Sequence, residues 1–250
     1  MDFRLAEDQQ RLRETVRKFV SREFKKGSIQ ELLARHEYPT DILKKAAESG
    51  FIGIHFPKKY CGRDLGLIEN VLVCEELCRG DSSLGICLSL ADFASDILLL
   101  FGSEEQKSKW LPKVARGEVL SCGAFTEPNH GSDIKTVDTL AARDKDQWVI
   151  NGSKLFISNG GPRAGFYSVL CKTDPECSVS YRGLSLILVE ADRPGVSATD
   201  IGPKMGIGLC HTAEVLLDNV RVPSSNIIGQ ENRGFYQLLK FFNESRVEVA

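Results

Sequence analysis

AFTEPNHGSD, residues 124–133, is the stretch that most constrains the fold and the chemistry of this chain. A short apolar run, which favours a strand, breaks at Thr126-Glu127-Pro128 and passes into the turn Gly131-Ser132-Asp133. Hydroxyl groups and backbone amides are therefore expected beside one strand end. This arrangement suits a flat ligand with polar groups along its edge, although a strand whose threonine merely caps a turn has the same local pattern.

The residues before this stretch, up to about Gly117, have helical patterns. Apolar residues at three-to-four spacing predict an amphipathic first helix. The run from Ser83 to Phe101 is apolar almost all round, which is typical of a buried helix in a bundle. The expected helices are Glu7–Phe24, Thr40–Gly50, Leu65–Cys78, Ser83–Phe101 and Glu104–Arg116, with an irregular connection at Phe51–Gly62.

After Gly117 the pattern changes to short β-rich runs separated by turn signals such as Asn151-Gly152. A spacing of about ten residues between these runs favours an antiparallel barrel or sandwich. A last helix is expected from about Gly234. The fold class is therefore a multidomain α+β protein, with an all-α bundle at 1–117, an antiparallel β-domain at 118–230 and the start of a C-terminal helical domain at 231–250. The expected strands are Leu120–Phe125, Thr139–Ala142, Trp148–Ile150, Phe166–Lys172, Leu184–Glu190 and Glu214–Leu217.

Composition narrows the classes of function. The 250 residues carry a net charge of -2 with 26% charged residues of both signs, so neither a nucleic-acid nor an anionic-membrane surface is expected. No apolar run approaches the ~20 residues of a membrane span, and the amino terminus lacks the apolar core of a signal peptide. We expect a protein of the bacterial cytosol, or of the mitochondrial matrix although no transit peptide is evident.

The eight cysteines do not predict a metal site. They form no Cys-x-x-Cys pair and are without partnering histidines, so reduced thiols in a reducing compartment are expected.

Several separated segments, together with residues 124–133, resemble the acyl-CoA dehydrogenase family. The resemblance runs in one order along essentially the whole chain. It implies that the chain corresponds to the N-terminal helical and middle β-domains, and that the family's C-terminal domain is missing apart from its first helix. The segments are GSEEQK at 102–107 with WLP at 110–112 and GE at 117–118, NGSK at 151–154 with ISNG at 157–160, KMG at 204–206, VRVP at 220–223 and GQENRGF at 229–235.

The resemblance implies FAD as the cofactor. Thr126 would bind the flavin edge through its hydroxyl, Phe156 would shield one flavin face, and the Ser158 hydroxyl would approach N5. The alternative is a core phenylalanine beside a turn serine. No metal is implied. The cofactor-binding residues carried over from the family are Gly123, Ala124, Phe125, Thr126, Ser132, Phe156, Ile157 and Ser158.

Acyl-CoA is the substrate that the resemblance implies. Ser132 would meet both cofactor and substrate, or only stabilise its turn, and Arg246 could instead pair with a carboxylate. Glu127 is expected to be structural, and Asn129 with His130 would either narrow the entrance or form a solvated loop tip. Gly208 stands where the family commonly has arginine. The remaining substrate-binding residues carried over are Asn243, Glu244, Ser245 and Arg246.

The implied reaction is α,β-dehydrogenation of an acyl-CoA thioester to the trans-2-enoyl-CoA, with hydride transfer to flavin N5. A minority of relatives place the catalytic carboxylate immediately before the arginine, where this chain has Ser245; Glu244 is the nearest carboxylate, one residue away. The usual base is expected outside this chain. The implied partners are electron-transfer flavoprotein and further copies of the chain in a dimer of dimers. A flavin monooxygenase of the same fold and a non-catalytic partner subunit are the alternatives.

Overall fold

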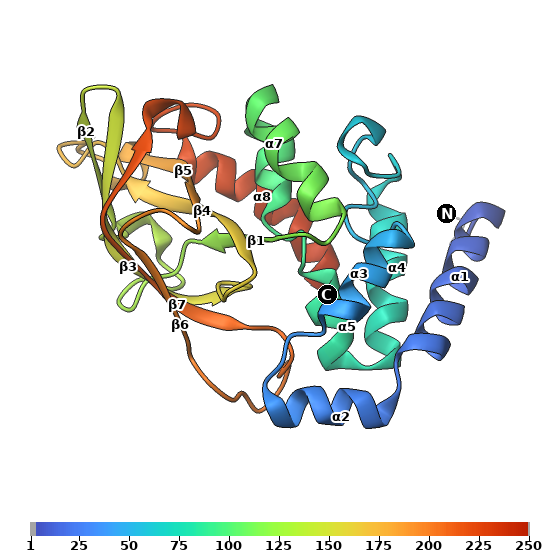
Figure 1. The fold of residues 1–250 in the computed structure, drawn as a ribbon. Helices are drawn as coiled ribbons and strands as arrows, with labels where there is room; N and C mark the ends of the chain where they lie inside the picture. The colour runs from blue at the N-terminus through green and yellow to red at the C-terminus, as the bar shows by residue number, and fades with distance from the viewer. Residues whose placement is uncertain (1–3, 250) are drawn as a thin grey trace.

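A computed structural model describes residues 4–249, and Figure 1 shows its helical region packed beside one sheet. The first helix buries Leu12, Val16 and Phe19, as its spacing predicts. Ser103 caps the last helix of this region by accepting a hydrogen bond from the backbone N–H of Gln106. The helices before the sheet are α1 Glu7–Glu23, α2 Lys26–Arg35, α3 Thr40–Glu48, α4 Leu67–Gly80, α5 Ser82–Ser89, α6 Ser95–Phe101 and α7 Glu104–Ala115.

The prediction of one continuous helix from Ser83 to Phe101 is wrong, because the chain breaks between α5 and α6. Partners from distant segments satisfy the backbone groups that this break frees. The side chain of Asn159 donates to the carbonyl of Leu90 at 2.6 Å, and the Ser121 hydroxyl accepts from the N–H of Ala94 at 3.2 Å. Apolar periodicity alone could not reveal these contacts. Through these two hydrogen bonds, the segment between α5 and α6 connects the helical region to the sheet.

One seven-stranded sheet follows, and it curls around its own core (Figure 1). The predicted order of a helical region, a β-domain and a further helix is confirmed. The sheet is mixed rather than wholly antiparallel, because β1 pairs in parallel with β4. The spacing of strands along the chain indicates which strands are joined by short turns. It does not indicate which strand in the sheet the first one pairs with. The strands are β1 Leu120–Ala124, β2 Leu140–Asp144, β3 Gln147–Ser158, β4 Ala164–Lys172, β5 Leu184–Glu190, β6 Val196–Asp200 and β7 Thr212–Pro223.

Strand β3 is much longer than predicted, because Asn151-Gly152 lies within it and does not form a turn. The glycine is required there by a close approach: a Cβ at Gly152 would lie 2.3 Å from the Thr139 hydroxyl oxygen. Strand β6 is absent from the predicted strands. It is almost wholly exposed, so it carries no alternating apolar signal.

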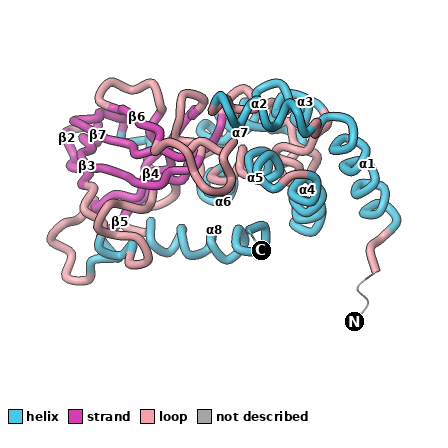
Figure 2. Tube along the Cα trace, turned by 90° about the horizontal axis from the view of Figure 1, so that it is seen from below, coloured by secondary structure: helices cyan, strands magenta, loops and turns pink. Residues whose placement is uncertain are grey.

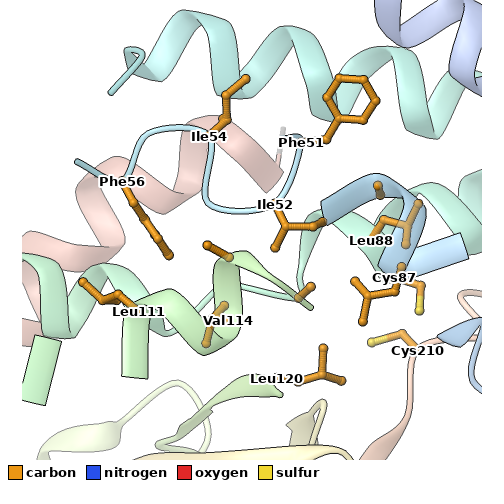
Figure 3. Close-up of a cluster of buried hydrophobic side chains, with 14 of the residues drawn as sticks. Phe51, Ile52, Ile54, Phe56, Cys87, Leu88, Leu111, Val114, Leu120 and Cys210 are labelled. Carbon is orange, nitrogen blue, oxygen red and sulfur yellow. The ribbon is translucent and has the colours of Figure 1, made fainter. Parts of the chain in front are cut away.

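The helix α8, Gly234–Val249, runs from the sheet toward the helical region (Figure 2). Its buried residues Leu238 and Phe241 belong to a core that also contains residues of α5, α7 and β1. Figure 3 shows part of this core, where Leu120 of β1 lies near Cys210. A second core fills the other side of the sheet. The helix therefore connects both parts of the molecule.

No helix within residues 4–249 is long and apolar enough to cross a membrane. All eight cysteines are free thiols, and burial raises the pKa of several of them, including Cys122.

Gly234 fixes where α8 meets the sheet. A Cβ at this position would lie 2.6 Å from the carbonyl carbon of Ser185 in β5, which is backbone and cannot rotate away. We expect Gly234→Ala to lower the free energy of unfolding by about 1–3 kcal/mol, because helix and strand must separate. Gly27→Ala is the control, since a Cβ there meets nothing within 4 Å. Equal stability of the two variants in urea denaturation would contradict this close contact.

Candidate functional site

The end of β1 places the predicted ligand-binding groups. Phe125 is 6% exposed, and its ring folds back over Gly123, where a Cβ would lie 2.6 Å from a ring carbon. The carbonyl of Thr126 accepts a hydrogen bond from the N–H of Leu155 in β3 at 2.9 Å. Ala124 is fully buried behind this surface. The absence of a side chain at Gly123 therefore lets the Phe125 ring pack against β1, and the hydrogen bond from β3 fixes the backbone of Thr126.

A buried ion pair supports the strand end from behind. The Lys154 ammonium lies 2.7 Å from a carboxylate oxygen of Glu127, and neither side chain is more than 3% exposed. The ammonium also donates to the carbonyls of Leu170 at 2.7 Å and Phe125 at 3.4 Å. Burial alone would raise the pKa of Glu127, but the Lys154 charge and the hydrogen bonds from Thr139 outweigh it and hold that pKa below its usual value. Glu127 thus has the structural contacts expected of it.

The loop after Pro128 carries Ser132, and hydrogen bonds close it. Glu127 accepts from the backbone N–H groups of Asp138 and Thr139 at 2.5 and 2.9 Å. The His130 ring contacts Asp138 at 3.0 Å and the Thr136 hydroxyl at 2.9 Å. His130 therefore ties the loop together instead of forming a freely solvated tip.

Glu127, His130 and Asp138 bring ligand atoms within 4.8 Å of one another, which is close enough to consider a metal ion. The Glu127 carboxylate, however, already neutralises Lys154 and accepts three hydrogen bonds from Asp138 and Thr139. A cation would have to displace these contacts. The chemistry of the cluster fits a structural role.

The far end of β3 presents an aromatic ring to solvent. Phe156 lies in the left-handed backbone region with φ of 59°, at an irregularity in the pairing of β3 with β7. Its side chain is 61% exposed, whereas Ile157 is 2% exposed. A strained backbone that turns a large apolar ring outward is common at ligand-binding surfaces. Ser158 follows half-buried, before Asn159 anchors the chain to the break between α5 and α6.

Two sides of helix α8, here called its flanks, face different cavities. Arg246 lies on the flank facing the Ser132 loop, 5.8 Å from the Phe242 ring, and donates to the Asn243 side chain at 3.2 Å. Glu244 faces a separate small cavity of about 160 Å³ beside His55 and Asp96. Two residues along a helix turn by about 200°, so these two side chains point to different sides. Ser245 lies between the flanks and is 3% exposed.

One cavity of about 340 Å³ joins three segments that are far apart in the sequence. The end of β1 contributes Phe125 and Thr126, the following loop contributes Ser132, and α8 contributes Arg246. The predicted site residues that line it are Phe125, Thr126, Ser132 and Arg246; those that do not are Gly123, Ala124, Phe156, Ile157, Ser158, Asn243, Glu244 and Ser245. The residues that sequence reasoning did not assign to the site are Gly131, Ile134, Lys135, Phe235, Leu239 and Phe242. Those on α8 repeat at helical spacing, which signals one face but not what that face meets.

The arrangement has the chemistry that a flavin requires. The ring edge of a flavin needs fixed donors and acceptors, and hydrogen bonds from Leu155 of β3 and from Lys154 fix the backbone at Thr126 and Phe125. The exposed ring of Phe156 offers an apolar surface to a planar group. Arg246 and Lys135 supply positive charge at the same cavity, which suits an anionic ligand.

Comparisons with known proteins identify the family of this chain. The sequence profile of the acyl-CoA dehydrogenase N-terminal domain matches residues 6–118, and that of the acyl-CoA dehydrogenase middle domain matches residues 122–220. Acryloyl-CoA reductase (NADH) of Anaerotignum propionicum is 35% identical over 100% of this chain and 63% of its own length. This chain therefore spans less than two thirds of that relative.

Two solved structures superpose closely. An acyl-CoA dehydrogenase from Geobacillus kaustophilus has a TM-score of 0.93 at 35% identity, covering 100% of this chain and 65% of its own. A structure described as an electron transferring flavoprotein of Acidaminococcus fermentans has a TM-score of 0.92 at 34% identity, with the same coverage. With both family domains matched and the fold shared, this chain belongs to the acyl-CoA dehydrogenase family.

Proposed function

We propose that this chain provides the flavin-edge and thioester-binding part of an FAD-dependent acyl-CoA dehydrogenase, which converts an acyl-CoA to its trans-2-enoyl-CoA. The observation that carries the proposal is the single cavity at which Thr126, Ser132 and Arg246 meet. A flavin placed against Thr126 and a thioester placed against Ser132 would then be neighbours. The finer details of the reaction rest on family membership.

Bound FAD would supply a hydride acceptor at flavin N5. The chain's own residues would hold it: the backbone of Gly123 to Thr126 and the Thr126 hydroxyl would bind the polar edge of the ring. Phe156 would pack against the ring, and the Ser158 hydroxyl would donate a hydrogen bond toward its hydride-accepting atom.

Ser132 and Arg246 bind the acyl-CoA, with Arg246 oriented by Asn243. The guanidinium is mostly exposed, so it suits the polar pantetheine or phosphate groups of CoA better than an acyl chain. Ser245 is buried beneath this surface and packs without contributing a base. We expect the proton-abstracting carboxylate to come from outside residues 1–250, as it does in most relatives.

The names of two relatives support proposals on the reaction direction and on a partner protein. One relative is named a reductase, so enoyl-CoA reduction is the second candidate, and it uses the same alignment of substrate and flavin in reverse. A close structural neighbour is described as an electron transferring flavoprotein, which favours that class of protein as the electron acceptor. We further propose a homotetramer, a dimer of dimers, in a cytosolic compartment.

The proposal predicts that acyl-CoA bleaches the oxidised flavin of the complete, flavin-loaded protein. The flavin absorbance near its visible maximum is followed anaerobically across a panel of acyl-CoA thioesters, and again with enoyl-CoA and NADH for the reverse reaction. Absence of bleaching by every acyl-CoA, with oxygen consumption by the reduced flavin, would favour the monooxygenase alternative. A protein that binds no flavin in any assembly would favour the non-catalytic partner subunit.

Glu244→Gln provides a sharper prediction. Because Glu244 faces the cavity beside His55 and Asp96, the variant is expected to bleach at the wild-type rate. Loss of bleaching by orders of magnitude, with flavin content retained, would instead identify Glu244 as the base.

A further inference from the structure

Residues 155–158 form a bulge segment, which carries the two side chains that the proposed function places against the flavin, Phe156 and Ser158. The pairing of β3 with β7 is interrupted between Lys154 and Ile157, and Phe156 has a φ of 59°. Bulges re-aim side chains, and a left-handed backbone at a bulky residue is strained, so neighbouring groups must hold the segment in place. The groups that hold it therefore decide where both side chains lie.

Asn159 fixes the C-terminal end of the bulge segment. Its side chain is 1% exposed, and the amide nitrogen donates to the carbonyls of Leu90 at 2.6 Å and Ser121 at 3.3 Å. Because carbonyl oxygens only accept hydrogen bonds, the amide nitrogen must face them, and this sets the orientation of the side chain. One short side chain thus ties the bulge segment both to the break between α5 and α6 and to β1.

The backbone of Asn159 is held as firmly as its side chain. Its N–H donates to the carbonyl of His211 at 2.8 Å, and its carbonyl accepts from the Cys122 thiol at 3.3 Å. Its φ is 63°, a left-handed conformation that asparagine adopts more readily than most residues other than glycine. Asparagine therefore meets two requirements at once, the backbone turn and the donors for two buried carbonyls. Glycine would meet only the first.

The N-terminal end of the bulge segment is tied to the proposed flavin edge. The N–H of Leu155 donates to the carbonyl of Thr126 at 2.9 Å. Ser121 lies near the start of β1, Thr126 follows the end of this strand, and β1 pairs with β4 along its length. The bulge segment is thus fixed at both ends to the same stretch of chain. The contacts of Asn159 therefore set the position of its side chains relative to Thr126.

We propose that Asn159 is a positioning residue for the proposed flavin site, acting through Phe156 and Ser158. This role rests on the proposed function and adds a residue to it. Because Asn159 is almost fully buried, it acts from behind the site and does not touch the ring itself. Without its amide, two buried carbonyls lose their donor, and the bulge segment is free to relax away from β1. A misplacement of about 1 Å can weaken the action of a group on a reacting atom by about 10²-fold.

Asn159→Gly tests this role, because it keeps the left-handed backbone and removes only the amide. The midpoint potential of the bound flavin is measured in the complete protein, for this variant alone and together with Ser158→Ala. We expect each single change to shift the potential in the same direction. The double variant should shift it by clearly less than the sum, because both changes remove the action of the same Ser158 hydroxyl. If Asn159→Gly does not fold, Asn159→Ser, which keeps one short donor, makes the same comparison.

Ser121→Ala is the matched control. The Ser121 hydroxyl is fully buried and accepts from the N–H of Ala94 at 3.2 Å. Its removal weakens the break between α5 and α6 but leaves the Ser121 backbone carbonyl that Asn159 contacts. It should therefore lower stability without shifting the potential. A shift as large as that of Asn159→Gly, or shifts of Asn159→Gly and Ser158→Ala that simply add, would overturn the positioning role.

Hydrogen exchange without flavin separates this role from the proposed function. In the complete protein stripped of flavin, Asn159→Gly should speed exchange of the Leu155 N–H by about tenfold or more, because two hydrogen bonds of the Asn159 side chain are lost. Ser121→Ala should change this exchange far less. These results support the positioning of the bulge segment even if the protein binds no flavin and the proposed function fails. Equal protection of the Leu155 N–H in wild type and Asn159→Gly would overturn it.

Discussion

Replacing Lys154 by methionine is expected to lower the free energy of unfolding by about 3–5 kcal/mol. The change leaves the buried Glu127 carboxylate without its counter-ion and removes the donor from the carbonyls of Leu170 and Phe125. Burying an unpaired charge costs far more than losing an exposed pair. Urea denaturation followed by circular dichroism measures the loss. Hydrogen exchange should report it locally, as faster exchange of the backbone around Asp138 and Thr139.

Two controls make this prediction specific. Lys59→Met breaks an exposed pair with Glu104, so we expect little change in the free energy of unfolding. The double variant Glu127→Gln with Lys154→Met removes both charges, so it should be more stable than Lys154→Met alone. A Lys154→Met variant as stable as Lys59→Met would show that the buried pair does not hold the loop.

The second large effect concerns Asp92, in the break between α5 and α6. Its carboxylate accepts a hydrogen bond from the N–H of Gly53 at 2.6 Å and is 8% exposed. Burial raises the pKa of Asp92 from 3.8 to about 6, with His55 opposing this shift and Asp96 adding to it. The folded state therefore holds a proton on Asp92 at a pH where the unfolded chain has released it.

This raised pKa fixes the sign of the pH dependence. Below about pH 4 Asp92 is protonated in both states, so it costs the folded protein no stability. Between about pH 4 and about pH 6 the unfolded chain releases this proton more readily, so the free energy of unfolding falls as the pH rises. Above about pH 6 the loss is complete and constant. An asparagine side chain at this position would keep an acceptor for the N–H of Gly53 without the charge. Asp92→Asn should therefore gain up to about 3 kcal/mol relative to wild type between pH 4 and pH 7.

Denaturation at a series of pH values tests the prediction, with the exposed Asp146→Asn as the control. The control should follow the wild-type profile. If the difference between Asp92→Asn and wild type is the same at both ends of the pH range, Asp92 has an ordinary pKa in the folded protein.

Elements with a strong local apolar pattern, either periodic or continuous, can be predicted from the sequence. The first helix is predicted at Glu7–Phe24 and spans Glu7–Glu23, and β5 has the predicted limits Leu184–Glu190. Elements whose stability comes from distant partners cannot be predicted in this way. The break after Ser89 depends on Ser121 and Asn159, and the continuation of β3 through Gly152 depends on Thr139. Partners so distant in the chain leave no pattern in the local sequence of the element that they stabilise.

The candidate site likewise has one part that the sequence predicts and another part that only the tertiary structure shows. Short motifs around Thr126 and Ser158 are recognisable because each is contiguous in the sequence. Whether Glu244 or Arg246 faces the cavity cannot be read from one helix, because helical spacing specifies the angle between them but not the direction in which α8 is turned. The seating of Gly234 on β5, and of Leu238 and Phe241 in the core, settles that direction.

By itself, the sequence determined the order of the domains, the family resemblance and the polar groups available at residues 124–133, since these depend on local composition and spacing. Only the tertiary structure decided which groups meet: it paired Lys154 with Glu127, brought Arg246 to Ser132 and packed Phe93 against Phe241. The physical reason is that burial and close packing act between segments distant in the chain. Local spacing therefore predicts an element's face, whereas packing selects what that face contacts.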